Sequence, residues 1–319
     1  MFAGIGGMRL GCQNVGGACV FSSEFDNNAQ RTYKTNHCEY PFGDITNISH
    51  IAESIPDHDI LLAGFPCQPF SHAGLKLGIE DTRGTLFHDI AKILDIKRPK
   101  FALLENVRGL VSHEKGKTLR VILNTLGEIG YRCNISPDVI ASGSDKELQE
   151  EAKKMILRSK DFGVPQIRQR IYMIFWRDSE IDSIDYPKPS NIETRVGDIL
   201  EQNPDPKLTI SDRIWEGHQR RKKANKEKGK GFGFNMVNED STHTWTISAR
   251  YYKDGSESLV EQKNKNPRML SPRECARLQG FPECFEFHQS KKSAYQQFGN
   301  SVSIPVVEAV ASSIIIHIS

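Results

Sequence analysis

A cysteine held between two prolines is the residue of this 319-residue sequence best placed to act as a nucleophile. Cys67 follows the apolar run Asp59-Ile60-Leu61-Leu62-Ala63 and stands within Gly64-Phe65-Pro66-Cys67-Gln68-Pro69-Phe70-Ser71. The short, branched run predicts a buried parallel strand, and open α/β sheets carry their chemistry at the carboxyl ends of such strands. The prolines limit the backbone freedom of the loop. The alternative is a small thiol that only packs, and the octapeptide alone does not decide between the two.

Two other polar groups stand beside apolar runs. Glu105 lies within Leu103-Leu104-Glu105-Asn106-Val107, where desolvation is expected to raise its pKa and let a protonated carboxyl donate to a substrate ring nitrogen. The alternative for Glu105 is a salt bridge or a helix cap. Arg168 and Arg170 alternate along an extended segment and so point to one side, which suits a planar carbonyl or a phosphate. Surface charge at the start of a strand is the alternative for this pair.

The glycine-rich segment Phe2-Ala3-Gly4-Ile5-Gly6-Gly7 predicts a tight turn that leads into a helix from about Met8. Such a turn lets a ligand approach the backbone and offers helix N-terminal amides. Glu24 follows about 20 residues on, a spacing that suits a carboxylate accepting ribose hydroxyls. Phe25 is placed to stack on a base, and Asp44-Ile45 is a candidate for adenine contact. These residues do not distinguish NAD from another adenosine-containing cofactor.

Alternating strand and helix patterns position these groups. We expect strands at 18–21, 60–63, 101–104 and 170–176, and helices at 27–36, 86–96, 119–129, 272–278 and 309–318. The rhythm predicts an α/β protein with a doubly wound sheet. Residues 143–160 read as a charged, solvated helical insertion, and after about Pro187 the apolar periodicity weakens.

Composition narrows the class of protein. A charged fraction of 26% and a hydrophobic fraction of 38% are typical of a soluble globular protein. The seven cysteines form no Cys-x-x-Cys pair and no secretory leader is apparent, which favours reduced thiols in the cytosol. No apolar segment approaches the roughly 20 residues of a membrane helix. The net charge of +2 is too small to indicate a nucleic-acid binder by itself, so the distribution of charge must decide.

One segment concentrates positive charge. Residues 220–230 are basic with a single acid, and Gly231-Phe232-Gly233-Phe234 follow. Such a run is usually a solvated helix face. Because this one leads into a glycine–aromatic loop, phosphate contact with readout by a flexible loop is favoured here.

In order along the chain come the glycine turn, Pro-Cys-Gln, Glu-Asn-Val, Gln-x-Arg-x-Arg, the segment 268–282 (RMLSPRECARLQGFP) and Gln297-Phe298-Gly299-Asn300-Ser301-Val302. On these motifs nearly the whole chain resembles the DNA cytosine-5 methyltransferases of the bacterial restriction–modification type. The resemblance implies a doubly wound, Rossmann-like S-adenosylmethionine-dependent methyltransferase fold with a smaller, irregular target-recognition domain. It divides the chain into a catalytic domain at 1–187, a recognition domain at 188–287 and a C-terminal helical segment at 288–319.

The resemblance assigns roles to the candidate residues. Cys67 attacks C6 of a flipped-out cytosine, Glu105 engages N3 and the 4-amino group, and Arg170 with Arg168 holds the base and its O2. The chemistry of the residues agrees, because addition at C6 makes C5 enamine-like and able to attack a sulfonium methyl. The base must leave the duplex to reach such a pocket.

The same resemblance implies S-adenosylmethionine as the cofactor and no metal. The positions matching its surroundings are Phe2, Gly4, Ile5, Gly7, Glu24, Phe25, Asp44, Ile45, Pro66, Leu86, Asn300 and Val302. Residues 71–84, with Ser71 and Arg83, match a loop that closes over DNA. Lys222, Lys226 and Lys228 are expected on phosphates, and Arg250 and Arg268 are candidate guanine readers. The recognition segment suggests a target such as CCGG, CCNGG or CCWGG.

The implied partners are double-stranded DNA and a restriction endonuclease with the same site, with the enzyme a monomer on DNA in the bacterial cytoplasm, at the nucleoid. Three alternatives stay open. A tRNA-directed relative is disfavoured by the long segment after Pro187. A catalytically silent DNA-binding relative is the second. A Cys-dependent amidohydrolase is the third, although no histidine motif pairs with Cys67.

One departure from the family pattern concerns the first residues. The family places an apolar strand directly before the glycine turn, at the position where this sequence has Met1. Absence of a central strand would expose ladder groups on two neighbours. We therefore expect residues 1–319 to fold poorly or to bind cofactor weakly unless upstream residues are added.

Overall fold

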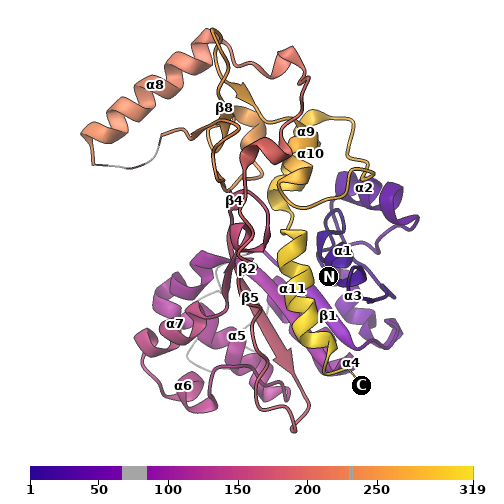
Figure 1. Ribbon diagram of the computed structural model, residues 1–319. Coiled ribbons are helices and arrows are strands. Elements are labelled where there is room, and N and C mark those ends of the chain that lie inside the picture. The colour runs from indigo at the N-terminus through magenta and orange to yellow at the C-terminus, as the bar shows by residue number, and fades with distance from the viewer. Residues whose placement is uncertain (67–84, 230, 232, 319) are drawn as a thin grey trace. The chain divides into compact units, whose positions relative to one another are not determined.

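The computed structural model describes residues 1–66, 85–229, 231 and 233–318, in two compact units (Figure 1). The first unit comprises Met1–Leu157, Gln169–Lys188 and Val307–Ser319, and the second comprises Arg158–Arg168 and Pro189–Val306. The apolar periodicity of the sequence weakens after about Pro187, and one boundary between the units lies close by, between Lys188 and Pro189. Residues 158–168 and 288–306 also belong to the second unit, whereas the sequence assigns them elsewhere. The domain boundaries read from sequence stay predictions.

A four-stranded sheet in the order β1-β2-β5-β3 forms the centre of the first unit. Its strands are β1 (Ile60–Gly64), β2 (Phe101–Val107), β3 (Ile156–Arg158) and β5 (Gln169–Trp176). β1 and β2 are parallel, with Gly64 opposite Glu105. β5 runs antiparallel to β2, with Tyr172 opposite Glu105 and Arg170 opposite Val107, a direction that the βαβ rhythm does not indicate. The strands expected at 60–63, 101–104 and 170–176 are confirmed.

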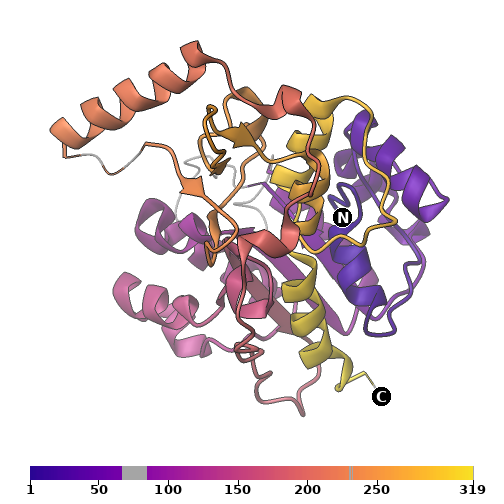
Figure 2. The same ribbon diagram turned by 45° about the horizontal axis from the view of Figure 1, so that its top comes forward.

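Helices cover both faces of this sheet. They are α1 (Gly7–Gln13), α2 (Asn27–His37), α3 (Ile45–Ile48), α4 (Leu86–Lys97), α5 (Lys117–Glu128), α6 (Pro137–Ala141), α7 (Asp145–Lys153) and α11 (Ile304–Ile315), of which residues 304–306 belong to the second unit. The Thr85 side chain caps α4, whose Ile90 and Leu94 are fully buried in the core against β1 and β2. The later part of α11 crosses the other face (Figures 1 and 2). The helices expected at 27–36, 86–96, 119–129 and 309–318 are confirmed, and α11 begins earlier than expected.

Two expectations for the first unit are wrong. Residues 18–21 are extended but pair with no strand among the described residues, and the nearest ladder contact is the single bridge between Ser23 and Phe42. Residues 143–160 are not a wholly solvated insertion, because α7 buries Leu148 and Ala152 in the core. Both predictions were made from local sequence patterns. Whether such a segment pairs as a strand or is buried depends on residues distant in sequence that pack against it.

The second unit has little regular structure. Its helices are α8 (Asp212–Glu227), α9 (Pro272–Arg277) and α10 (Lys291–Asn300), and its strands are β4 (Gln166–Ile167), β6 (Met236–Val237), β7 (Thr244–Trp245), β8 (Leu259–Val260) and β9 (Arg268–Met269). β4 pairs with β7, and β8 lies between β6 and β9. Short 3₁₀ turns at 159–162, 196–199, 206–208 and 251–253 link them, as turns at 49–54 and 108–116 do in the first unit. The helix expected at 272–278 is confirmed.

Aromatic rings pack around Phe298 of α10. The Phe298 ring on α10 lies 5.4 Å from Phe281 and 6.3 Å from Phe285 between ring centroids.

The stretch Lys291–Ile315 is long and apolar enough to cross a membrane by length and composition alone. However, 56% of its apolar window is buried in the structure, and the helix is interrupted between α10 and α11. Core helices of soluble proteins pass the same test, so this is weak evidence for a membrane span.

Candidate active site

An ion pair lies at the carboxyl end of β2. Oε1 of Glu105 is 3.1 Å from Nε of Arg170, and the two side chains are 10% and 16% exposed. The antiparallel register of β2 and β5 places them together, because Arg170 lies opposite Val107, two residues beyond Glu105. The structure therefore joins two residues that the sequence places 65 positions apart and assigns to one site.

The end of β1 lies directly against this pair. A Cβ atom at Gly64 would be 3.4 Å from Oε2 of Glu105. The Asn106 side chain donates to the Phe65 carbonyl at 2.9 Å, and its oxygen accepts from the Val107 amide at 2.8 Å. Asn106 thus fixes the start of the loop after β1 to the end of β2. The sequence analysis predicts no role for Asn106. Its position directly after Glu105, at the end of an apolar strand, is the sequence feature that indicates a polar contact there.

Three predicted site residues lie outside the described residues: Cys67, Ser71 and Arg83. The described chain reaches Pro66, which is exposed, one residue before Cys67. The buried Phe65 packs its ring against Phe87 of α4, with centroids 5.8 Å apart. The residues that lead to Cys67 are therefore held at the strand end where Glu105 lies.

Arg168 is in a different environment from Arg170. It belongs to the second unit and is 3% exposed. Its guanidinium donates to the backbone carbonyls of Ile247 at 3.2 Å, Gly299 at 3.1 Å and Ser301 at 2.5 Å. This arrangement joins three segments of the second unit, so the geometry indicates a positioning role. The expected contact of Arg168 with the base stays a prediction.

The predicted cofactor carboxylate lies against the glycine turn. Glu24 is 8% exposed, and its two oxygens accept from the amides of Gly4 at 2.8 Å and Asp26 at 2.9 Å. A carboxylate has about four acceptor positions, which leaves capacity for two hydroxyl groups. Gly4 has φ +54°, and a Cβ there would meet no atom within 4 Å. Open space above a glycine beside a carboxylate fits a ribose that approaches the backbone.

A histidine packs behind the same turn. Gly6 has φ +92°, and a Cβ at this position would lie 2.1 Å from Nε2 of His37, so only glycine fits. His37 ends α2, and burial together with the nearby Arg9 charge lowers the pKa of His37 to about 4. The turn is therefore held against a neutral imidazole at neutral pH.

The other predicted cofactor residues are distributed over both units. Phe25 is 68% exposed beside Glu24, and Asp44 is partly exposed, two residues after Phe42, whose backbone bonds to Ser22 and Glu24. The structure thus brings Phe25 and Asp44 to one edge of the first unit. The remaining positions are buried Ile5, Gly7 and Ile45, partly exposed Phe2 and Leu86, exposed Pro66, and, in the second unit, exposed Asn300 and buried Val302.

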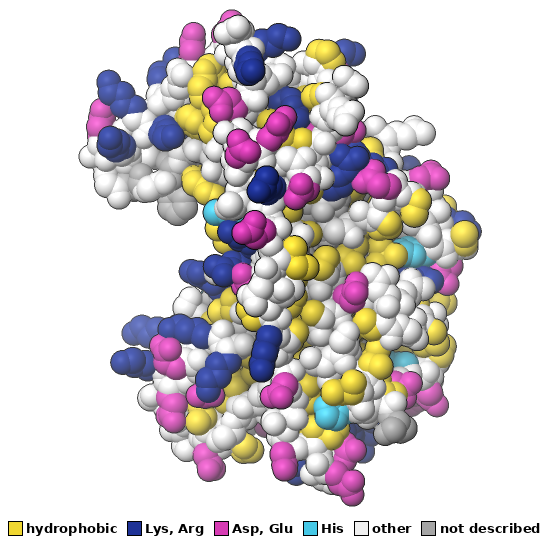
Figure 3. Space-filling view, in the orientation of Figure 1, with side chains coloured by type: hydrophobic (Ala, Val, Ile, Leu, Met, Phe, Trp, Pro, Cys, Tyr) yellow, Lys and Arg dark blue, Asp and Glu magenta, His cyan; other side chains and the backbone are white. Residues whose placement is uncertain are grey.

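The first eight residues of the basic run, 220–227, form the second half of the helix α8, and readout by the loop that follows the run stays a prediction. Lys222, Lys226 and Lys228 are all exposed, and Figure 3 shows dark-blue side chains along this part of the second unit. The helix is held on one side, where the Phe234 ring lies 4.9 Å from Trp215 between centroids and 4.3 Å from the Lys222 ammonium. Its basic end faces solvent, as a phosphate-binding helix requires.

The expectation for Arg268 is wrong, and that for Arg250 stays open. Arg268 is 5% exposed and forms two 2.8 Å hydrogen bonds with the fully buried carboxylate of Glu274. Its donors are engaged inside the second unit, so Arg268 does not reach a guanine. Glu274 also completes a capping box with Ser271 at the start of α9, a signal that the Ser-Pro-Arg-Glu spacing carried. Arg250 is exposed.

Within the described ranges, no cluster of His, Cys, Asp or Glu has the form of a metal site.

Comparisons with known proteins identify the family of the chain. Residues 1–316 match the family described as C-5 cytosine-specific DNA methylase. Type II methyltransferase M.DsaV of Dactylococcopsis salina is 52% identical, covering 100% of this chain and 85% of the relative. Type II methyltransferase M1.ScrFI of Lactococcus lactis subsp. cremoris is also 52% identical, covering 99% and 77%. The crystal structure of S. pombe Dnmt2 methyltransferase superimposes with a TM-score of 0.74 at 21% identity, over 99% of this chain and 97% of that one.

The structural likeness confirms the Rossmann-like methyltransferase fold expected from the sequence. The family match and the relatives carry the assignment of activity, since they extend over nearly the whole chain. The chain therefore belongs to the C-5 cytosine-specific DNA methylase family, as a type II DNA cytosine-5 methyltransferase of the restriction–modification kind.

Proposed function

We propose that this enzyme methylates C5 of a flipped cytosine through a covalent bond between Cys67 and C6 of the base. The observation that carries the proposal is the ion pair of Glu105 and Arg170 beside Gly64, the last residue of β1 and three residues before Cys67. A ring nitrogen acceptor and a ring carbonyl are the groups that a carboxyl and a guanidinium recognise together.

The proposed reaction begins with the Cys67 thiolate. Its addition to C6 breaks the C5–C6 double bond, and the electron pair becomes available at C5. Glu105 holds a proton at N3, which lowers the charge that develops on the ring, and Arg170 holds O2. Transfer of a methyl group to C5, loss of the C5 proton to a base, and departure of Cys67 restore the aromatic ring. When bound, S-adenosylmethionine supplies the sulfonium methyl group.

The residues of the glycine turn fit that cofactor. We propose that Glu24 accepts the ribose hydroxyls, that Gly4 allows close approach, and that Phe25 and Asp44 contact the adenine. Support comes from the open space at Gly4, the acceptor capacity of Glu24 and the exposure of Phe25.

The proposed substrate is double-stranded DNA with a CC-containing palindrome such as CCGG, CCNGG or CCWGG. The exposed Lys222, Lys226 and Lys228 contact phosphates, and Arg250 reads guanine. We propose that the enzyme acts as a monomer in the bacterial cytoplasm, with a restriction endonuclease of the same specificity. Bisulfite sequencing of DNA from cells that express the enzyme reports the methylated base and its context, and unmethylated CC sites would contradict the target proposal.

A covalent trap tests the mechanism. Duplex DNA with 5-fluorocytosine at the target should form a denaturant-resistant complex with the wild-type enzyme and cofactor, because fluorine at C5 prevents the elimination that frees Cys67. Cys67→Ser should form none while it still binds the duplex. Cys133→Ser is the matched control and should trap normally. A wild-type enzyme that binds DNA and cofactor without trapping would favour a silent DNA-binding protein.

Transfer RNA is the second substrate to test. Equal amounts of duplex DNA and tRNA with labelled cofactor compare the two classes directly. The proposal requires methylation of the duplex, and preferential methylation of tRNA would overturn it.

A further inference from the structure

One cluster of side chains joins two segments of the second unit that carry proposed DNA contacts. The first segment is the helix α8, and the second is the 3₁₀ turn at 251–253, which begins directly after Arg250. In Figures 1 and 2 the later half of α8 projects away from the other helices of its unit. His218 and Arg221, in the middle of α8, fasten the helix to the residue that follows the turn, Asp254.

The three side chains share their hydrogen bonds. Nε2 of His218 lies 2.9 Å from the carbonyl oxygen of Asp254, which can only accept, so this ring nitrogen donates. Nδ1 of His218 accepts from Nη2 of Arg221 at 3.0 Å, and the same Nη2 donates to Oδ2 of Asp254 at 3.0 Å. His218 is 1% exposed. One guanidinium nitrogen therefore bonds both to its own helix and to the neighbouring turn.

The turn is also held from the interior of the second unit. Tyr251 is fully buried, and its hydroxyl donates to the Ser258 carbonyl at 2.6 Å and accepts from the Leu270 amide at 2.8 Å. Gly255 has φ +65°, and a Cβ there would lie 2.7 Å from Cγ of Met269, so this position suits only glycine. The backbone on both sides of Asp254 is thus fixed.

Arg250 is carried by this fixed backbone. Its amide donates to Oγ of Ser248 at 3.1 Å, and its carbonyl accepts from the Lys253 amide at 3.0 Å. Its side chain is exposed, whereas Tyr251 beside it is buried. Because α8 is attached at Asp254, a displacement of the helix moves the end of the turn and the backbone that presents Arg250.

The attachment has more effect on geometry than on stability. The side chains of Arg221 and Asp254 are 49% and 29% exposed, and accessible ion pairs contribute little to the free energy of unfolding. The guanidinium is nevertheless a planar donor with fixed directions, so its two bonds set the angle between α8 and the turn. Loosening this contact should change how Arg250 is presented without unfolding the second unit.

We propose that His218, Arg221 and Asp254 form a joint that positions Arg250 for sequence readout when α8 is bound to phosphates. Phosphate contacts set the register of a protein on a duplex, and base contacts supply the discrimination between sequences. The joint transmits the register from α8 to the base reader, which makes Arg221 a positioning residue. This inference rests on the proposed function, because it assigns discrimination between DNA sites to Arg250.

Methylation of plasmid DNA, followed by bisulfite sequencing, tests the joint whatever the target sequence is. The wild-type enzyme defines the target, and the measured quantity is the ratio of methylation at sites with one altered base pair to methylation at the target. Arg221→Met should raise this ratio by about fivefold or more, the lower end of what one arginine–guanine pair supplies. Asp254→Ala should act similarly, and the double variant should not exceed the larger single effect.

Arg220→Met is the matched control. It removes one positive charge from the neighbouring exposed position of α8 and leaves the joint in place. Weaker phosphate binding lowers methylation of all sites alike, so the ratio should keep its wild-type value. The fraction of folded enzyme also cancels in this ratio. A ratio that is equal in Arg221→Met and Arg220→Met would overturn the joint.

A third variant, Arg250→Met, separates failure of the joint from failure of the proposed function. The joint requires that Arg221→Met and Arg250→Met relax discrimination at the same base pair of the target. Relaxation at different base pairs would overturn it while leaving the proposed reaction intact. A wild-type enzyme that methylates no cytosine in the plasmid would overturn the proposed function, and the inference with it.

Discussion

Two buried arginine–carboxylate pairs in the described part of the chain differ in how far they are enclosed. In the first unit, Oε1 of Glu105 lies 3.1 Å from Nε of Arg170, with side chains 10% and 16% exposed. In the second unit, Glu274 and Arg268 make two contacts at 2.8 Å, with side chains 0% and 6% exposed. The same two residue types thus form an accessible pair at a strand end and an enclosed pair that holds loops together.

The enclosed carboxylate, that of Glu274, is bound from all sides. Glu274 accepts four hydrogen bonds: two from Arg268, one from the Ser271 amide and one from the Glu201 amide. All of its acceptor positions are therefore used within the protein. The Glu105 pair lies at the carboxyl ends of β1 and β2, beside Gly64, and both of its side chains are more exposed. Enclosure, and not residue type, separates the two pairs in the structure, and the reactive role of Glu105 is the proposal to be tested.

The sharpest test of this comparison is Glu105→Gln. Loss of a positioned proton donor should lower kcat by about 10²–10⁴-fold. Because glutamine keeps the shape of the side chain and this pair is more exposed than the pair of Arg268 and Glu274, the melting temperature should change little. Methyl transfer to duplex DNA under saturating conditions and thermal unfolding measure the two effects. If the activity fell only in proportion to the fraction of unfolded protein, Glu105 would have a structural role like that of Glu274, and the proposed difference between the two pairs would be wrong.

The complementary change is Arg268→Ala. Removing one partner of a fully buried pair leaves an uncompensated carboxylate, and the free energy of unfolding should fall by about 3–5 kcal/mol. Urea unfolding measures this loss. The protein that stays folded should retain its kcat, because Arg268 does not reach the substrate. Glu274→Gln, which keeps the shape, should lose less, and stability unchanged in both variants would contradict the structural role.

A smaller effect concerns pH. The pKa of His37 is about 4 in the fold against 6.5 as its ordinary value. The unfolded state therefore binds more protons between these values, so the contribution of His37 to stability is complete above about pH 6.5 and is lost as pH falls toward 4. The size should be on the order of 1 kcal/mol after solvent screening. His37→Gln should flatten the urea midpoint between pH 7 and pH 5, and an unchanged slope would show that His37 is not responsible.

The smallest effect is expected on α8, outside both pairs. Lys226→Gln should remove one phosphate contact and reduce the slope of log affinity against log salt by about 0.9. Because phosphate contacts carry no sequence information, the loss should be similar for target and non-target duplexes. Lys291→Gln is the control in the same unit, since Lys291 is paired with Asp205 at 2.7 Å. Fluorescence anisotropy at several salt concentrations distinguishes the two.

The strands and helices around the site could be predicted because their patterns are local. The run at Ile60–Gly64 and the Thr85 cap before α4 each predict their element without distant partners. The meeting of Glu105 and Arg170 followed from motif order and family resemblance, not from spacing. Only the antiparallel register of β5 supplies the physical reason.

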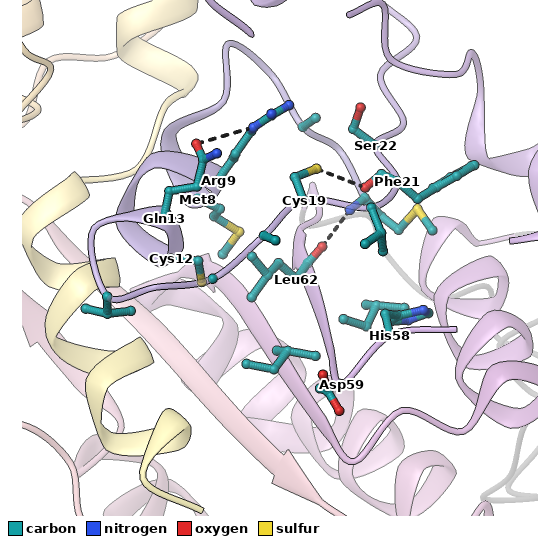
Figure 4. Close-up of a pocket in the computed structure, with 18 of the residues that line it drawn as sticks. Met8, Arg9, Cys12, Gln13, Cys19, Phe21, Ser22, His58, Asp59 and Leu62 are labelled. Carbon is teal, nitrogen blue, oxygen red and sulfur yellow. Dashed lines mark hydrogen bonds between the residues drawn. The ribbon is translucent and has the colours of Figure 1, made fainter. Parts of the chain in front are cut away.

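The failures depended on tertiary contacts. The sequence predicts contact with the substrate for both Arg268 and Arg170, and the structure pairs the first with the fully buried Glu274 and the second with the partly exposed Glu105. Arg168 lies two residues before Arg170 but belongs to the other unit. The strand predicted at 18–21 pairs with no strand among the described residues, and these residues line a cavity together with residues of β1 (Figure 4). None of these outcomes is encoded in a window of a few residues.

The first and last helices of the first unit meet across almost the whole sequence. The Asn14 side chain donates to Glu308 at 2.8 Å over a separation of 294 residues, and a Cβ at Gly11 would lie 2.7 Å from Val307. The entropy of closing so long a loop grows only with the logarithm of its length. Lengthening the intervening second unit by about 60 residues would cost this contact only about 0.2 kcal/mol. Insertions within the second unit are therefore expected to leave the packing of α1 on α11 almost unchanged in free energy.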